Sequence, residues 1–176
     1  MKEILSDQAE HIARGFSPIL GQRPRVLILG SMPGQASLEA SQYYAHPRNA
    51  FWPIMAALFA IDGQQSYESR ARQLTEKGVA VWDVLKACIR PGSLDSAIAE
   101  STIVVNDFSR LFRDFPEIRL VAFNGQAAAR YWHKYVMPEQ AVPSALRTAV
   151  LPSSSPAHAS LNLIQKQQRW REVLLS

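Results

Sequence analysis

Cysteine is almost absent from this sequence, with Cys88 the only one among 176 residues. A lone thiol excludes a disulfide framework, and it excludes an iron–sulfur cluster or cysteine-based zinc site built by this chain alone. Histidine is also sparse and shows no ligand spacing; the four residues are His11, His46, His133 and His158. We therefore expect no metal and no cofactor, and a reducing, intracellular setting such as the cytoplasm.

Long apolar runs are missing as well. The N-terminal stretch MKEILSDQAEHIARGF carries acidic residues and has no extended apolar core, so we expect neither a signal peptide nor a membrane-spanning helix. No internal repeat, low-complexity tract or linker interrupts the sequence. We therefore expect one domain over residues 1–176, acting as a monomer.

Charge is scarce and only mildly unbalanced. Charged residues make up 19% of the chain and apolar residues 47%, which is typical of a soluble globular protein. The formal net charge is +4 and the isoelectric point is about 9.5. This balance is compatible with a polyanionic partner such as nucleic acid, but it does not identify one.

Four short apolar segments predict buried strands. They span residues 25–30 (RVLILG), 79–84 (VAVWDV), 119–125 (RLVAFNG) and 148–152 (TAVLP). Their nearly continuous apolar character favours a sheet that is covered on both faces. Helical patterns lie between them, and this alternation indicates parallel pairing with right-handed crossovers. The predicted fold class is α/β, a three-layer α/β/α sandwich with a four-stranded, mainly parallel sheet.

Capping residues mark the ends of two predicted helices. Asn49 is the expected N-cap of the helix that begins AFWPI, with Pro53 in its first turn. Ser66 is the expected N-cap of the next helix, which Gly78 ends as a left-handed C′ residue.

An unusually long connection follows the first predicted strand. The stretch GSMPGQASLEASQYYAHPRNAFWPI takes roughly twenty residues to reach its helix, where about four to six are usual. Ligands of parallel sheets bind beyond the carboxyl ends of the strands. We therefore expect this connection to meet DVLKACIRPGSLD, NGQAA and LPSSSPAH in one cleft.

With these segments in order, the sequence resembles the uracil-DNA glycosylase superfamily. GSMPG resembles the first motif of that family and SSSPAHA its second, and the whole set is most similar to the hypoxanthine (deoxyinosine) DNA glycosylase branch. The resemblance extends over residues 30–159 and implies excision of a deaminated base from DNA to leave an abasic site. Two positions depart from the better-known branches: Ser31 and Met32 stand where those branches carry a water-positioning Asn or Asp, and Ser153 replaces a His.

The resemblance places the catalytic residue outside GSMPG. It implies that Asn49, in the segment HPRN, positions the attacking water. An amide suits this task because it offers a donor and an acceptor without adding charge. The alternative for Asn49 is helix capping alone.

The residues expected to bind the base combine an aromatic ring, polar side chains and an accessible backbone. Tyr44 matches the ring that stacks on the flipped base, whereas Tyr43 is expected to face the core. Asp83 and Asn124 are candidates for reading the base edge, and Asp83 could equally cap nearby backbone groups. The remaining candidates are the main chain of Gly30, Ser31, Met32 and Pro33, and Phe51 as a wall of the pocket.

The residues expected to bind DNA lie in two loops. They are His46 and Arg48 from HPRN, and Ser153, Ser154, Ser155, Pro156 and His158 from SSSPAHA. Ala157 is small where other branches carry a larger wedge, which suggests His158 for that role. The alternative for SSSPAHA is a turn that caps the last helix.

Three functions remain open from the residues. A monofunctional glycosylase is favoured, since nothing aims Lys86 at the sugar as the amine nucleophile of a lyase step. A non-catalytic damaged-DNA or nucleotide-binding domain on the same scaffold is the alternative. A small-molecule hydrolase ranks last, because the sequence has no GxSxG elbow, P-loop or dinucleotide fingerprint. Hypoxanthine is favoured by the branch, and residue chemistry does not separate it from uracil or xanthine.

Overall fold

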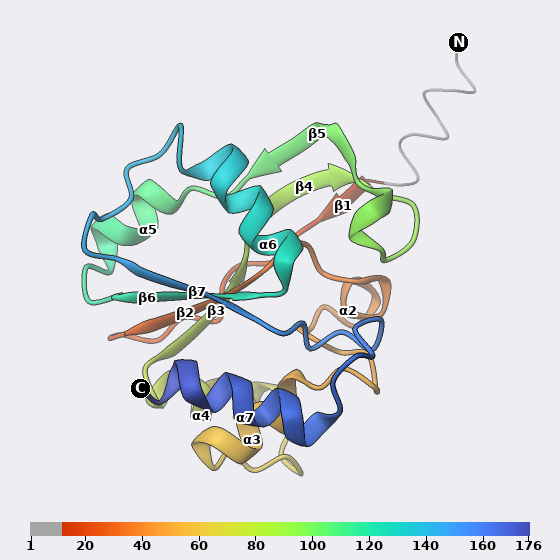
Figure 1. Cartoon of the computed structure of the whole chain (residues 1–176), viewed down its shortest axis with the longest axis vertical. Helices are drawn as coiled ribbons and strands as arrows, with labels where there is room; N and C mark the ends of the chain where they lie inside the picture. Colours follow the sequence, from red (N-terminus) through yellow and green to blue (C-terminus); the bar gives the residue numbers. More distant parts are fainter. Residues whose placement is uncertain (1–11) are drawn as a thin grey trace.

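The computed structural model describes residues 12–176 (Figure 1). Its central sheet has four parallel strands in the order β3-β2-β6-β7. These strands are β2 (Val26–Gly30), β3 (Val79–Asp83), β6 (Leu120–Asn124) and β7 (Arg147–Leu151). Each predicted strand agrees with an observed one to within about a residue at most ends, and the predicted fold class is confirmed.

Helices cover both faces of this sheet, as Figure 1 shows. One face packs against α3 (Phe51–Phe59), α4 (Tyr67–Glu76) and α7 (Leu163–Leu174). The other packs against α5 (Phe108–Asp114), α6 (Gln126–Tyr131) and the π-helix η2 (Trp132–Val136). Alternate residues of β2 divide between the two cores: Leu27 and Leu29 lie in one and Ile28 in the other. Burial on both faces therefore explains the continuous apolar runs of β2, β3 and β6. The expectation that the fourth strand is buried is wrong, because β7 lies at the edge of the sheet and Val150 is exposed.

A second, three-stranded sheet was not predicted. Its antiparallel strands, in the order β1-β4-β5, are β1 (Ile12–Arg14), β4 (Leu85–Ile89) and β5 (Ala99–Val105). The segment DVLKACIRPGSLD, expected at the end of a parallel strand, contains β4, because the chain passes from β3 into β4 through the single residue Val84. This passage sets the segment after β4, which contains the short 3₁₀-helix η1 (Asp95–Ala97), beside the loop that follows β2.

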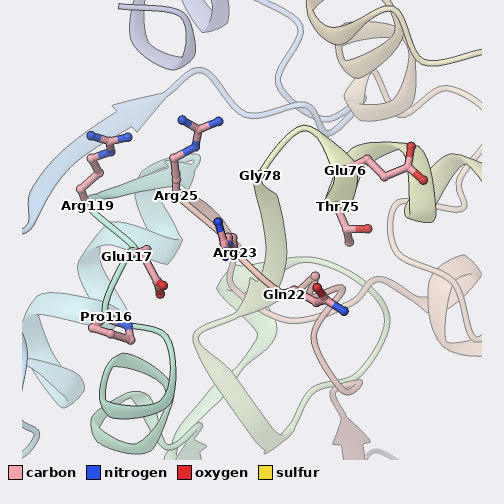
Figure 2. Close-up of a pocket in the computed structure, with 10 residues that line it drawn as sticks. Gln22, Arg23, Arg25, Thr75, Glu76, Gly78, Pro116, Glu117 and Arg119 are labelled. Atoms are coloured by element: carbon pink, nitrogen blue, oxygen red, sulfur yellow. The ribbon is translucent and has the colours of Figure 1, made fainter.

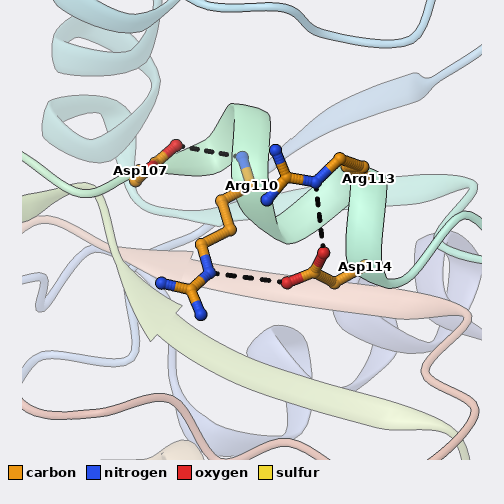
Figure 3. Close-up of polar contacts among 4 residues, drawn as sticks. All are labelled: Asp107, Arg110, Arg113 and Asp114. Carbon is orange, nitrogen blue, oxygen red and sulfur yellow. Dashed lines mark hydrogen bonds and ion pairs between the residues drawn. The ribbon is translucent and has the colours of Figure 1, made fainter.

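The helix ends follow local capping chemistry. Ser66 accepts a hydrogen bond from the Ser69 amide and Gly78 has a φ of +76°, so both capping predictions for α4 are confirmed. Asp107 caps α5 in the same way, and the ion pairs of Asp114 with Arg110 and Arg113 lie on the exposed side of this helix (Figure 3). Exposed pairs of this kind contribute about 0–1 kcal/mol each, so the buried face of α5 holds it in place.

The start of α3 differs from the prediction by one residue. Ala50 is the N-cap, and Asn49 precedes it while still accepting a hydrogen bond from the Phe51 amide at 3.0 Å. The long connection before α3 also contains a helix that was not predicted, α2 (Gln35–Ala40). Within residues 12–176, no helix combines the length and the apolar character that crossing a membrane requires. Residues 1–11 of the N-terminal segment considered above, among them His11, lie outside the described residues.

Candidate functional site

A cavity of about 370 Å³ opens where all four parallel strands end. Its lining comes from the last residues of β2, β3 and β6, from the segments that follow β2, β4 and β7, and from α2 and the connection between α2 and α3. Its volume lies at the lower end of the range of small-molecule sites. Most of the predicted site residues line it: Gly30, Ser31, Met32, Pro33, Tyr44, His46, Asn49, Asp83, Asn124, Ser153, Ser154, Ser155 and Pro156.

Three predicted residues do not line the cavity. Phe51 is fully buried, and the expectation that it forms a wall of the pocket is corrected: its ring lies behind Tyr44 and supports it. Arg48 is exposed outside the cavity, and His158 is turned to Ser160, whose Oγ lies 3.2 Å from its Nε2. Arg48 and His158 can therefore contact DNA only outside the cavity.

Gly30 allows two polar groups to approach the main chain closely. A Cβ at this position would lie 2.5 Å from Asp83 Oδ1 and 3.0 Å from the Tyr44 hydroxyl. A residue with a Cβ at this position would therefore displace both the Asp83 carboxyl and the Tyr44 hydroxyl. The first glycine of GSMPG is therefore explained by crowding at the floor of the site, because its φ is not in the left-handed region.

Tyr44 occupies a strained backbone position at the cavity. Its φ of +56° is in the left-handed region, which costs a residue with a side chain about 1–2 kcal/mol. Its ring stacks on Phe51 with centroids 4.1 Å apart, and its hydroxyl is buried without a hydrogen-bond partner. Tyr43, by contrast, is buried and donates from its hydroxyl to the Ser17 carbonyl, so the expectation that it faces the core is confirmed.

Asn49 joins the cavity wall to the start of α3. Its Oδ1 is held by the Phe51 amide, and the next residue, Ala50, donates from its amide to the Ser154 carbonyl at 2.9 Å. This second bond ties HPRN to the SSSPAHA loop. The side chain is therefore fixed in orientation, while Oδ1 keeps a second lone pair and Nδ2 keeps its hydrogens.

Two carboxylates give the cavity an unusual electrostatic character. Asp83 is 4% exposed and its Oδ2 has no hydrogen-bond partner. Burial, reinforced by the charge of Asp95 and opposed by Arg90, raises the pKa of Asp83 to about 7. Burial also raises the pKa of Asp95, against the hydrogen bond that Ser31 Oγ donates to its Oδ1 at 2.6 Å. Near neutral pH, Asp83 can therefore present a donor as well as an acceptor.

Asn124 holds the SSSPAHA loop with both ends of its amide. Its Oδ1 accepts from the Ser154 amide and its Nδ2 donates to Ser154 Oγ, each at 2.8 Å. Ser154 itself is buried. Only one N–H and one lone pair of the Asn124 amide stay free to bond a base. This geometry therefore favours a role in positioning the loop over the expected role in reading the base edge.

The segment after β4 contributes residues that the sequence did not single out. Ser93, Leu94 and Asp95 line the cavity. Arg90 is 3% exposed, and its guanidinium donates to the carbonyls of Met32, Pro33 and Gly92. A buried arginine bound to main-chain carbonyls fixes GSMPG and RPGSLD relative to each other. The one sequence signal was the Pro-Gly turn within the polar stretch RPGSLD.

A larger groove lies at the opposite, amino end of the sheet. It has a volume of about 970 Å³ and is lined by Arg23, Arg25, Arg119, Glu76 and Glu117 among others (Figure 2). It contains none of the predicted site residues. The convergence of polar side chains, the strained tyrosine and the pKa shift at the carboxyl end favour the smaller cavity as the functional site. Among the residues described, no cluster of three or more side chains has the composition of a metal site.

Comparison with known proteins agrees with the resemblance found in the sequence. The family model "Uracil DNA glycosylase superfamily" matches residues 18–175. A Methanosarcina acetivorans protein named hypoxanthine DNA glycosylase is 36% identical over 164 residues, which cover 92% of this chain and 98% of the relative. A Methanosarcina barkeri protein of the same name is 38% identical over 119 residues, covering 67% and 74%.

The fold has a relative among solved structures. The solution NMR structure of a candidate uracil DNA glycosylase from Methanosarcina acetivorans superposes with a TM-score of 0.73 at 34% identity. The match covers 92% of this chain and 98% of that one.

Proposed function

Since this chain belongs to the uracil DNA glycosylase superfamily, we propose that it is a monofunctional DNA glycosylase that excises a deaminated base, with hypoxanthine favoured. The single observation that supports this most is the meeting of Asn49, Tyr44 and Asp83 in one cavity at the carboxyl end of the sheet. Hypoxanthine is favoured because both curated relatives are named for it.

The reaction needs a base outside the duplex and a positioned water. A stacked base is unreachable, so the nucleotide is rotated out and its base enters the cavity. The oxygen of water bonds to C1′ while the glycosidic bond breaks and its electron pair leaves with the base. The proton lost by the water balances the proton gained by the departing base, and the products are the free base and an abasic site.

Asn49 supplies the contact to water in this proposal. The bond from the Phe51 amide holds Oδ1, and its second lone pair accepts a hydrogen from the water. Orientation of this kind contributes through a fixed attack geometry, without any charge on the side chain.

Tyr44 and Asp83 bind the base. The Tyr44 ring, stacked on Phe51, extends an aromatic stack that a purine can join, with base stacking contributing about 1–3 kcal/mol. Neutral Asp83 offers an O–H to the base carbonyl and a C=O to the neighbouring ring N–H. Hypoxanthine, xanthine and uracil all carry such a carbonyl beside an N–H, so Asp83 recognises deaminated bases as a class.

The SSSPAHA loop holds the phosphates on either side of the extruded nucleotide. The hydroxyls of Ser153 and Ser155 and the exposed guanidinium of Arg48 are suited to phosphate oxygens, which provide most of the affinity of proteins for DNA. Asn124 positions this loop through Ser154.

The test measures excision from labelled DNA that carries one inosine, xanthine or uracil, with alkaline cleavage of the abasic product. We expect the wild-type protein to excise hypoxanthine, and Asn49→Ala to lose about a hundredfold or more in rate because the water loses its orientation. Binding of Asn49→Ala to abasic-site DNA should persist.

Asn162→Ala is the matched control. Asn162 caps α7 and does not line the cavity, so its loss should cost stability and leave excision in place. A wild-type protein that binds modified DNA without cleaving any of these substrates would instead support the non-catalytic binding domain. Equal losses of excision in both variants would show that Asn49 serves only as a cap.

A further inference from the structure

A large apolar side chain stands exposed at the mouth of the cavity. Leu94 lines the cavity, yet 60% of its surface is accessible to water. Of the cavity's lining residues, all within the described part of the chain, it is the only large apolar one so exposed. Water contact makes this placement unfavourable by about 25 cal/mol for each Å² of apolar surface, so a partner that covers Leu94 would be bound more tightly.

The segment that carries Leu94 is anchored on both sides. Ser93 Oγ accepts from the Gln35 amide at 2.8 Å, and Asp95 Oδ1 accepts from Ser31 Oγ at 2.6 Å. Arg90 Nε donates to the Gly92 carbonyl at 2.9 Å. These bonds join the segment to the loop after β2 and to α2. Leu94 is thus a protruding apolar tip on a fixed support.

The SSSPAHA loop lacks such a side chain. Among its residues that line the cavity, only Ala157 is exposed, and it carries a single methyl group. His158 lies outside the cavity and interacts with Ser160. Neither residue presents apolar volume at the opening through which a nucleotide would enter.

We propose that Leu94 enters the DNA duplex and fills the space left by the extruded nucleotide. The inference rests on the proposed function. Rotation of a nucleotide out of the stack leaves an apolar gap between the flanking base pairs, and proteins fill such gaps with Leu, Ile, Met, Phe or Pro. Leucine in the gap loses its contact with water and prevents the nucleotide from returning.

Filling this gap matters only in duplex DNA, so the test compares excision rates on duplex and single-stranded DNA. In a single strand no opposite base and no continuous stack need to be held apart. Leu94→Ala should therefore lower the ratio of duplex to single-strand excision rates about tenfold to fiftyfold, the value expected for three buried carbon atoms. Leu94→Met should restore most of this ratio, because methionine supplies similar apolar volume.

Leu175→Ala is the matched control. Leu175 is 47% exposed at the end of α7, away from the cavity, so its truncation should leave the ratio unchanged. An equal fall on both substrates, or an unchanged ratio in Leu94→Ala, would overturn the proposal. A loss of the ratio in His158→Ala with none in Leu94→Ala would transfer the role to the SSSPAHA loop.

A second readout separates this inference from the glycosylase activity. Duplexes that carry 2-aminopurine next to the target nucleotide gain fluorescence when the stack opens, whether or not a bond is cleaved. We expect the wild-type protein to produce this gain on an inosine or abasic duplex and Leu94→Ala to lose most of it. Fluorescence gain without excision would reject the proposed function and retain Leu94 as the intercalating residue, whereas no gain with the wild type would reject Leu94.

Discussion

Replacement of Asp83 by Asn would test the electrostatics of the cavity directly. The carboxyl is almost fully buried at the end of β3, its Oδ2 has no hydrogen-bond partner, and burial raises its pKa from 3.8 to about 7. The charged groups that act on it are Asp95, which adds to the shift, and Arg90, which opposes it. The substitution Asp83→Asn keeps the shape of the side chain and removes its titration.

The sign of the effect follows from the direction of this shift. Between pH 3.8 and about 7 the folded protein holds a proton on Asp83 that the unfolded chain has released. Stability contributed by this group is therefore lost as pH rises through that window. A shift of about three pKa units corresponds to about 4 kcal/mol in full, of which about 2.5 kcal/mol falls between pH 5 and pH 8.

Urea denaturation at pH 5 and pH 8 measures this difference. We expect the wild type to lose about 2.5 kcal/mol more stability between these pH values than Asp83→Asn does, or roughly 1 M in the urea midpoint. Asp107→Asn is the control, because Asp107 caps α5 at the surface and Asn can replace it as a cap (Figure 3). Parallel pH profiles for wild type and Asp83→Asn would refute the reasoning, since they would mean that Asp83 titrates alike in the folded and unfolded chains.

Two further substitutions test the floor and the wall of the cavity. Tyr44→Ala should slow excision about tenfold to a hundredfold, because the base loses its stacking partner. Tyr44→Phe keeps the ring and should retain excision. An unchanged rate in Tyr44→Ala would refute the stacking role. Gly30→Ala should lower the free energy of unfolding by about 1–3 kcal/mol, because its Cβ would meet Asp83 Oδ1 at 2.5 Å. Gly63→Ala, whose Cβ meets nothing within 4 Å, is the comparison in the same urea titration, and equal effects would mean that Gly30 is not crowded.

The parts of the fold that could be predicted are the strands and helix ends that depend on residues close together in the sequence. Continuous apolar runs predicted all four parallel strands, and Ser66 with Gly78 predicted both ends of α4. The second sheet could not be predicted in this way. Its strand β4 has an irregular burial pattern, with Leu85 and Cys88 buried and Lys86 exposed, because its pairing with β5 shifts register twice.

The candidate site shows the same division. Motif order was enough to nominate Asn49, Tyr44 and Asp83, and the structure brings all three to one cavity. The sequence could not show that Phe51 supports Tyr44 from behind, or that both ends of the Asn124 amide are engaged by Ser154. Such assignments depend on which neighbours occupy the hydrogen-bonding groups of each side chain.

The sequence by itself determined the class of fold, the four strand ends that would carry the site, and most of the residues gathered there. Apolar periodicity and turn chemistry, which act over a few neighbouring residues, indicated the fold class and the strand ends, whereas the family resemblance implied most of the site residues. Tertiary structure alone decided the protonation of Asp83, the strained backbone of Tyr44 and the exposure of Leu94 at the rim. Each of these depends on neighbours that local sequence patterns do not identify, such as Asp95, Phe51 and Ser31, whose burial and approach arise only when the two sheets and their helices pack together.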